Sequence, residues 1–559
     1  MKRAAIVVLG SLAVLGSLAL LPNILTQQPA DGQVGTGQPA QTQSSRAVSN
    51  DGVSAPEQAT LVVDGSDEAA SNRNPGTPAR PLRTVNRAAS LAAANNLRGV
   101  GTRIQVRPGV YRESVMLGPW RGQTPAPISF VGPTNGKAVL SGSDVWTDWS
   151  RVPDTDLYRH AWPYRWGLSQ LPTGWTEARI PDIVRRRELV FANGRLLRQV
   201  LATADLAHTP GGGFAVHEAN GLVTIRLPAG QEIDRTRIEV ATRDHVLYVS
   251  GRTNVQVSNL TFQHAASPLQ RAAVRVERSS DVQIGNAEFV RNNWTGLALN
   301  DDRDITIRRS AFDANGSMGF SALRVKTLRL ERTSNSYNTW RGNWGGWYGW
   351  ENGMKLIGVH GAVLQNHTAV GNHSYGLWLD TDNRDVTVRD ARICNNRLAG
   401  VFLEASQGPI TLDRSTICRN GARGILAGNA SGVTVTDSLV VNNGLAQIVL
   451  SGVQSGRQVT DWESRERLNV LSTGWSVEGN RIQAANNQLL VDNTWSAATW
   501  AHARPNYRWN GNVWTSAADR PFRLLGTYRL GTFSNWRAHT GLDGGSTHAP
   551  VPAPQQTTR

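Results

Sequence analysis

The feature that most constrains this chain is a repeat of 23 or 24 residues in its second half. Six glycines each open a short apolar run, and they lie 23, 34, 23, 24 and 24 residues apart: Gly296, Gly319, Gly353, Gly376, Gly400 and Gly424. A regular repeat of this length indicates a fold of stacked, similar units. The one long step holds 11 additional residues, so an inserted loop is expected to interrupt the stack there.

Each repeat unit contains three short strand signals. A glycine-led run such as Leu377-Trp378-Leu379 is followed by a run such as Val386-Thr387-Val388 and then by a single apolar residue such as Ile393. Alternation with period two places the first and third residues of a run on one face. Three short strands per turn, with no helical pattern between them, predict an all-β fold: a right-handed parallel β-helix whose rungs stack about 4.8 Å apart.

Two sets of residues recur in register with the glycines. One apolar set is expected to form an inward column of the core: Leu297, Phe320, Met354, Leu377, Val401 and Ile425. One asparagine set falls at a turn, where asparagine tolerates left-handed backbone, and we expect it to stack as an internal ladder: Asn292, Asn315, Asn338, Asn372, Asn396, Asn420 and Asn443.

The rest of the chain differs from the repeat. Lys2 and Arg3 precede a long apolar run, which is typical of an export signal or an N-terminal anchor. We divide the chain into a signal peptide or anchor (1–30), a disordered linker (31–60), an N-terminal cap with the first rungs and a helix near 81–95 (61–143), an inserted β-rich subdomain (144–240), the β-helix with a Trp-rich loop at 339–350 (241–542), and a disordered tail (543–559).

Three segments resemble a known family. The run Asn74-Pro75-Gly76-Thr77-Pro78-Ala79-Arg80-Pro81-Leu82-Arg83-Thr84-Val85 and the run Val106-Arg107-Pro108-Gly109-Val110-Tyr111-Arg112 resemble the opening of secreted β-helix proteins of the pectin-lyase-like superfamily. The run Trp536-Arg537-Ala538-His539-Thr540-Gly541-Leu542-Asp543 is similar to a C-terminal motif of some members. The resemblance covers about residues 61 to 545. It implies the fold, but the superfamily holds lyases, hydrolases, epimerases and tailspikes, so the reaction stays open.

The net charge of +15 favours an acidic partner such as a uronate-rich polysaccharide, although arginines that only solvate an extended surface would give the same charge. Nucleic acid is not expected, because no Lys/Arg cluster is interleaved with aromatic residues. We therefore expect a monomer that is secreted or held in the periplasm or cell envelope. Association with the envelope through the N-terminal segment stays open.

Counting outward from the repeat glycines brings charged and aromatic residues onto three consecutive rungs, where we expect them to face solvent: Lys355, Trp378, Asp380, Phe402 and Glu404. The inserted loop of the 34-residue step comes directly before the strand of Lys355, so we expect it to lie beside these residues. Indole rings stack on sugars, so the predicted substrate-binding residues are Trp378, Phe402, Trp340, Trp344, Trp347 and Trp350. Arg341 and Arg384 are candidates for binding a substrate carboxylate, with surface solvation as the alternative.

Three functions fit these residues. Asp380 and Glu404 lie one rung apart, close to the spacing of the two carboxyls of a retaining glycosidase, and this hypothesis is slightly favoured and needs no cofactor. A polysaccharide lyase or uronan epimerase is the alternative, in which Asp380, Asp382 and Glu404 bind Ca²⁺ and Lys355 is the base. The third is a non-catalytic, glycan-binding envelope protein.

The chain has two cysteines, Cys394 and Cys418. They are 24 residues apart, so they are predicted to stack on adjacent rungs. Both a disulfide and a pair of reduced thiols remain open.

Overall fold

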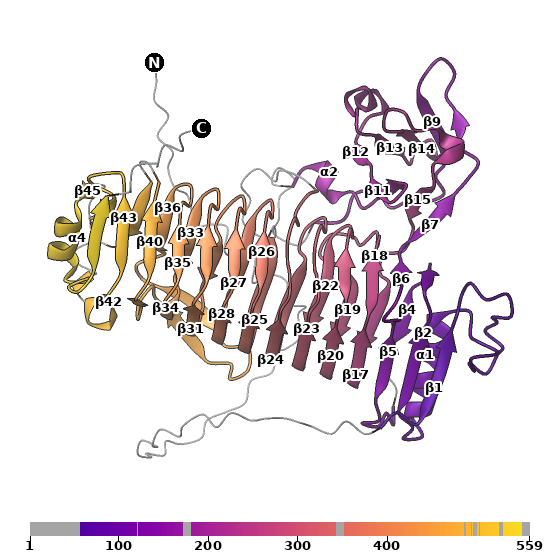
Figure 1. The fold of residues 1–559 in the computed structure, drawn as a ribbon, viewed down its shortest axis with the longest axis horizontal. Helices are drawn as coiled ribbons and strands as arrows, with labels where there is room; N and C mark the ends of the chain where they lie inside the picture. Colours follow the sequence, from indigo (N-terminus) through magenta and orange to yellow (C-terminus); the bar gives the residue numbers. More distant parts are fainter. Residues whose placement is uncertain are drawn as a thin grey trace, which may run out of the picture.

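The computed structural model of the protein describes residues 56–119, 121–171, 180–341, 352–485, 488–493, 495, 500–501, 503–524 and 529–550. Most of these residues form short parallel strands stacked along one axis into a β-helix (Figure 1). The predicted signal or anchor and most of the predicted linker lie outside the described residues. In the described ranges, no helix is long and apolar enough to span a membrane.

A helix and short strands close the N-terminal end of the stack (Figure 1). Helix α1 (Val85–Asn96) begins after Thr84, whose side chain accepts a hydrogen bond from the Arg87 backbone and so caps the helix. Its buried face carries Val85 and four alanines. It packs on the first strands, which are β1 (Ala59–Val63), β2 (Thr102–Val106), β4 (Val115–Leu117) and β5 (Ile128–Val131).

The early rungs follow from these strands by parallel pairing. They contain β3 (Gly109–Tyr111), β6 (Ala138–Ser141), β16 (Leu247–Ser250), β17 (Thr253–Ser258), β18 (Leu260–Gln263), β19 (Ala272–Glu277), β20 (Ser280–Gly285) and β21 (Glu288–Val290).

A mostly antiparallel, β-rich subdomain is inserted between β6 and β16, beside the early rungs (Figure 1). One sheet contains β7 (Ser143–Trp146), β10 (Val190–Ala192), β11 (Arg195–Leu196) and β15 (Ile238–Ala241). The other contains β8 (Ser150–Arg151), β9 (Leu157–Ala161), β12 (Arg198–Val200), β13 (Gly213–His217) and β14 (Leu222–Arg226). Three short helices complete it: α2 (Asp182–Arg185), η3 (Thr203–His208) and η4 (Ile233–Arg235). Asn193 and Gly194, both with positive φ, form the β10–β11 turn.

The glycine-led runs form one continuous set of parallel strands along the stack. Its strands are β22 (Thr295–Asn300), β24 (Phe320–Glu331), β25 (Asn352–Gln365), β27 (Tyr375–Asp380), β30 (Val401–Glu404), β33 (Arg423–Gly428) and β36 (Ala446–Ser451). The predicted register is confirmed, because Leu297, Phe320, Met354, Leu377 and Val401 pair in succession and are all buried.

The second and third sets of strands complete each turn. The second set continues with β23 (Arg303–Arg308), β28 (Arg384–Arg389), β31 (Gln407–Asp413) and β34 (Ser431–Thr436), while β24 and β25 are long enough to supply it themselves. The third set is β26 (Thr368–Val370), β29 (Arg392–Cys394), β32 (Thr416–Cys418) and β35 (Leu439–Val441).

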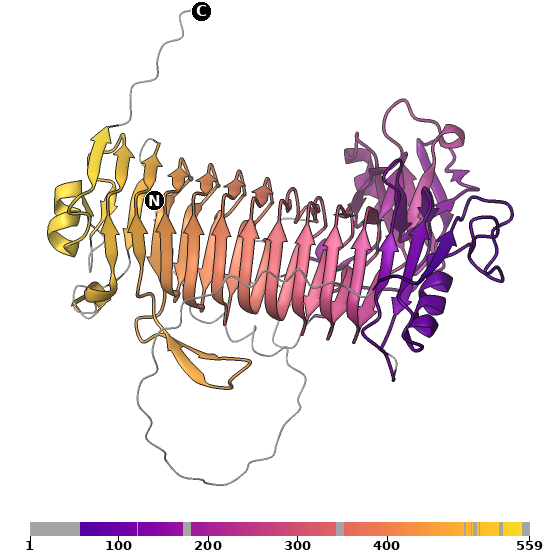
Figure 2. The same cartoon turned by 60° about the horizontal axis from the view of Figure 1, so that its bottom comes forward.

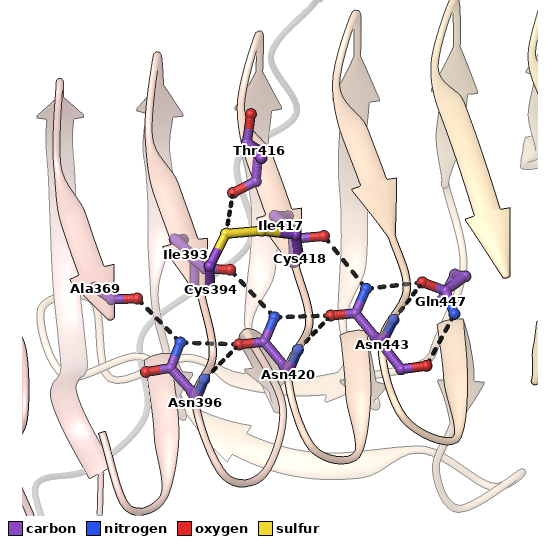
Figure 3. The surroundings of a disulfide bond; sticks show 10 residues. All are labelled: Ala369, Ile393, Cys394, Asn396, Thr416, Ile417, Cys418, Asn420, Asn443 and Gln447. Atoms are coloured by element: carbon purple, nitrogen blue, oxygen red, sulfur yellow. Dashed lines mark hydrogen bonds between the residues drawn. A yellow bond between two sulfur atoms is a disulfide. The ribbon is translucent and has the colours of Figure 1, made fainter. Parts of the chain in front are cut away.

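The asparagines form the predicted ladder, which runs from rung to rung along one corner of the β-helix (Figure 3). In each step, the backbone and side-chain amides of one asparagine donate to the side-chain oxygen of the next, as from Asn396 to Asn420 at 3.0 and 2.9 Å. The ladder ends on Gln447, which accepts from Asn443. Cys394 and Cys418 form a disulfide between β29 and β32, beside the ladder.

The remaining strands extend the stack to its C-terminal end, which a helix closes (Figure 1). These strands are β39 (Ser476–Glu478), β40 (Arg481–Ala484), β41 (Leu489–Asn493), β42 (Arg508–Asn510), β43 (Val513–Ser516), β44 (Phe522–Arg523), β45 (Leu530–Gly531) and β46 (Thr547–Pro550), with η5 (Arg504–Asn506) and α4 (Phe533–Thr540). Two further strands, β37 (Arg457–Thr460) and β38 (Arg467–Val470), form a hairpin outside the stack.

The predicted start of the disordered tail, at residue 543, is too early, because ordered structure continues past it. Asp543 is buried and accepts hydrogen bonds from Trp536, Asn512 and Ser546, and β46 pairs with β43. The buried indole and amide donors at the end of the stack need a charged acceptor, and Asp543 supplies it.

Candidate active site

The five outward residues lie together as the repeat register predicts. Strands β25, β27 and β30 are consecutive rungs, in which Lys355 pairs with Trp378 and Trp378 pairs with Phe402. Asp380 ends β27 and Glu404 ends β30, so both carboxyls lie at the same edge of the stack, one rung apart.

The expectation that these residues face solvent is wrong. Lys355 and Asp380 are 1% and 2% exposed, and Trp378 is equally buried. The aromatic rings cover each other: Trp378 and Phe402 lie 4.9 Å apart between ring centroids, and Tyr375 packs against both. Trp378 and Phe402 are therefore packed in a cluster rather than presented as an open platform for sugar, and they support the charged residues beside them.

The charged residues form one continuous network. Lys355 Nζ lies 2.8 Å from Asp380 Oδ2 and 3.8 Å from the centroid of the Trp378 ring. Trp378 Nε1 donates to Glu404 Oε2 at 3.1 Å, and Arg457 Nη1 lies 2.5 Å from Glu404 Oε1. The side chains of Glu404 and Arg457 are 13% and 15% exposed, so this end of the network is its open side.

The pKa values of the two carboxyls are shifted in opposite directions. Burial raises the pKa of Asp380, but the charge and hydrogen bond of Lys355 outweigh it, so this pKa ends below its usual value. Burial and the neighbouring charge of Asp380 raise the pKa of Glu404 to about 7, against the opposing effect of Arg457. Near neutral pH the site therefore combines an ionised Asp380 with a Glu404 that carries a proton much of the time.

The predicted calcium ligands do not form one site. Asp382 has a positive φ, so its side chain leaves the alternation of β27. Its carboxylate accepts hydrogen bonds from Gln407 and from the Trp462 backbone, away from the Lys355 network. The residues present do not fit Ca²⁺ held jointly by Asp380, Asp382 and Glu404.

Asp382 belongs instead to a second cluster. This cluster contains His360, Asp382 and Asp461. An imidazole nitrogen of His360 and one carboxylate oxygen from each aspartate lie within 4.8 Å of one another. Arg384 pairs with Asp461 Oδ2, and His360 lies between Asp382 and Glu463, so side-chain cations already balance these carboxylates. Arg384, predicted to bind a substrate carboxylate, is committed to this cluster.

Two residues of the predicted aromatic loop have structural roles. Arg341 is buried and donates to Asn293, to the Glu188 carbonyl and to Gln199, which ties the inserted subdomain to the stack. Trp340 packs against Phe191 in the same contact and donates to a backbone carbonyl. Arg341 is therefore taken up by the contact between the subdomain and the stack, while Trp340 is only partly buried there. Trp344, Trp347 and Trp350 lie outside the described residues.

Arg457 was missed because a second long step of the repeat was not recognised. Val435 of β34 pairs with Val477 of β39, 42 residues later, whereas Leu412 of β31 pairs with Val435 after 23. The additional residues include the antiparallel hairpin β37–β38, the orange hairpin that leaves the stack in Figure 2. The turn-rich run Gly452-Val453-Gln454-Ser455-Gly456 was the sequence signal for it.

The comparisons with known proteins identify the fold. A family model described as a right handed beta helix region matches residues 244–440. The chain is a right-handed parallel β-helix protein. No curated protein matches the sequence.

Among solved structures, the β-helix protein is similar to the chain in the complex structure of XylC with xylose, at 15% identity and a TM-score of 0.61, covering 82% of this chain and 83% of that chain. A structure entitled glycoside hydrolase has 12% identity and a TM-score of 0.47, covering 87% and 99%. The A-module of the Azotobacter vinelandii mannuronan C-5 epimerase AlgE4 has 14% identity and a TM-score of 0.41, covering 83% and 96%. At 15% identity, the likeness to the XylC structure shows the shared fold alone, and that fold is the one predicted from the pectin-lyase-like resemblance.

Proposed function

We propose that this β-helix protein is a carbohydrate-active enzyme that hydrolyses glycosidic bonds with retention of configuration, with Asp380 as the nucleophile and Glu404 as the general acid and base. One observation carries the proposal: two carboxyls lie one rung apart, and their surroundings push their pKa values in opposite directions. A retaining glycosidase needs this pairing, with carboxyls about 5–5.5 Å apart, one ionised and one protonated.

The chemistry proceeds in two steps. Glu404 donates its proton to the glycosidic oxygen while Asp380 attacks the anomeric carbon, so the leaving alcohol departs and a glycosyl ester forms on Asp380. Glu404, now ionised, then takes a proton from water, the resulting hydroxide attacks the anomeric carbon, and Asp380 is released as a carboxylate. Lys355 orients Asp380 through their 2.8 Å ion pair before the attack and after its release.

The charge of the site supports an acidic sugar as substrate. With Glu404 protonated, Lys355 and Arg457 carry two positive charges against the single negative charge of Asp380. The chain as a whole has a net charge of +15, which attracts anionic polymers. XylC is described with bound xylose, so xylosides belong in the substrate panel beside uronate polymers.

Elimination by a lyase or epimerase is less well supported by the same residues. A base must be a free amine, but the Lys355 ammonium group is paired with Asp380 and faces an indole ring, which is the environment of a cation. The carboxylates proposed for calcium also belong to two separate clusters.

A panel of polysaccharides and aryl glycosides tests the proposal, with reducing ends and the ultraviolet absorbance of unsaturated sugars measured in parallel. We expect reducing ends without absorbance, and we expect Asp380→Asn to abolish them. A 2-deoxy-2-fluoro glycoside of the accepted sugar should label Asp380, as read by peptide mass spectrometry. Growing absorbance would replace hydrolysis by elimination. Binding without any product would replace catalysis by glycan recognition.

A further inference from the structure

Hairpin β37–β38 is the one inserted segment in the described chain that contributes a charged side chain to the Lys355–Asp380–Glu404 network. It lies outside the stack of rungs, and its two strands pair only with each other. Arg457 is the first residue of β37, and its guanidinium meets Glu404 of β30, 53 residues earlier in the sequence. Among the described residues, the hairpin therefore adds one charged member to a network whose other charged members come from regular rungs.

The two oxygens of Glu404 have different partners. Oε2 accepts from the indole of Trp378, a buried donor fixed by its neighbours, whereas Oε1 faces Arg457, a longer and more exposed side chain. A protonated carboxyl oxygen can still accept a hydrogen bond, but it has lost its negative charge and carries a hydrogen that needs an acceptor, so the donor beside it is held less tightly when Glu404 gains its proton. Arg457 is the donor that can move, which places the acidic proton on Oε1.

The hairpin is held to the rungs by one aromatic contact. Trp462, in the hairpin turn, stacks on His360 with ring centroids 5.2 Å apart, and its backbone amide donates to Asp382 at 2.8 Å. The indole also lies against Gly358, where an added Cβ would come within 2.8 Å of it. Gly358 has a positive φ, so glycine is needed at this position for the backbone as well as for the contact.

Charges and apolar residues complete the docking. Asp461, almost fully buried, pairs with Arg384 and accepts hydrogen bonds from the Glu463 and Ser464 amides. Glu463 meets Lys326 at 2.5 Å and lies 3.2 Å from both His360 and Arg384. Val459 and Val470 pack on Ala405, directly after Glu404. These contacts hold the turn and both strands of the hairpin against the rungs, so Arg457 reaches Glu404 from a docked segment.

We propose that hairpin β37–β38 presents Arg457 to the site as a positioning residue that holds ionised Glu404 through Oε1 and releases it when Glu404 carries the proton. The inference rests on the proposed hydrolase function. Burial and the charge of Asp380 raise the pKa of Glu404, while Arg457, Lys355 and the hydrogen bond from the Trp378 indole favour its ionised form. In the reaction, Arg457 stabilises Glu404 while it waits, ionised, to accept a proton from water.

The test compares Arg457→Met with Arg457→Lys, and uses Arg467→Met, an exposed arginine on β38, as the matched control. The pH dependence of kcat/KM is measured for each variant. Arg457→Met should move the alkaline limb to higher pH by roughly one unit, because a nearby opposite charge is lost. Arg457→Lys should restore most of the wild-type profile, and Arg467→Met should leave it unchanged. An alkaline limb that is the same in Arg457→Met and wild type would overturn the proposal.

A second measurement does not depend on activity. The carboxyl band of Glu404 is identified by infrared difference between wild type and Glu404→Gln, and its titration is followed in wild type and Arg457→Met. We expect the midpoint to rise in the variant, and an unmoved midpoint would contradict the inference even if no substrate were ever found. Conversely, an inactive wild type with a shifted midpoint would refute the hydrolase and leave the Arg457–Glu404 coupling standing. Trp462→Ala should reproduce the shift in part, because it loosens the hairpin without touching the network.

Discussion

Two columns of buried polar residues run along this stack, and they are held in different ways. The asparagine ladder is neutral, repeats on consecutive rungs from Asn292 to Asn443, and satisfies itself, because each side-chain oxygen receives the amides of the previous rung. The column of Lys355, Asp380 and Glu404 is charged, occupies three rungs, and needs Arg457 from outside the repeat to complete it. Buried amides can be satisfied by the same residue on the next rung, whereas buried charges need partners of opposite charge, which the regular repeat does not supply.

The largest expected effect is at the charged column. Glu404→Gln should lower kcat/KM by about 10²–10⁴-fold for substrates with poor leaving groups, because the general acid is lost. In wild type, the rate should fall at alkaline pH with a midpoint near the Glu404 pKa of about 7. The acid limb should lie below the usual range of an aspartate, because Lys355 lowers the pKa of Asp380.

The same variant has an opposite effect on stability. The pKa of Glu404 is raised in the folded protein, so its contribution is favourable at low pH and is lost as the pH rises through about 7. Glu404→Gln should therefore unfold no earlier than wild type above that pH, as measured by thermal melting. A variant that melts well below wild type there would show that the charged column supports the fold as well as the reaction.

Breaking the ladder should do the reverse and cost stability. Asn396→Leu leaves the backbone and side-chain amides of Asn372 without their acceptor. Each buried group left unpaired costs about 1–3 kcal/mol. Denaturant unfolding measures the loss, with Thr387→Val on the outer face of β28 as the control. Equal midpoints for Asn396→Leu and wild type would show that the ladder does not stabilise the stack.

The disulfide should also act on stability alone. Cys394 and Cys418 close a loop of 24 residues beside the ladder, on a different strand set from the charged column. The double Cys→Ala variant should lose about 3 kcal/mol of unfolding free energy by loop entropy. Its kcat/KM at a temperature where it is folded should match wild type. A folded but inactive variant would show that the two sides of the stack are coupled.

The smallest effect is expected at the docking cluster of the hairpin. Burial lowers the pKa of His360, but hydrogen bonds to Asp382 and Glu463 outweigh it, so the pKa is raised. The charged imidazole therefore tightens the docking below its usual pKa of 6.5, and this contribution is lost as the pH rises through the raised value. His360→Gln should lower the free energy of local opening of β37 and β38 at low pH by about 1 kcal/mol. Amide hydrogen exchange in the two strands would then be faster. Unchanged exchange there would remove His360 from the docking.

Much of the fold followed from period alone. The pairings of Lys355 with Trp378 and of Trp378 with Phe402, and the amide ladder, are arithmetic consequences of a 23- or 24-residue repeat. Burial of the outward column could not be predicted the same way, because strand alternation says which face a residue lies on but not what packs over that face. Arg341 illustrates the limit, since it sits in the predicted loop but is consumed by the inserted subdomain.

The sequence by itself determined the stack, its register and the rungs that carry Lys355, Asp380 and Glu404, because stacked strands place residues one period apart at neighbouring positions. Only the tertiary structure decided which of these groups are charged partners and which stand apart. Arg457 meets Glu404 across 53 residues, and Asp382 turns away from Asp380 although only Thr381 separates them. Contacts made by inserted segments depend on docking rather than on period, and a repeat pattern holds no record of them.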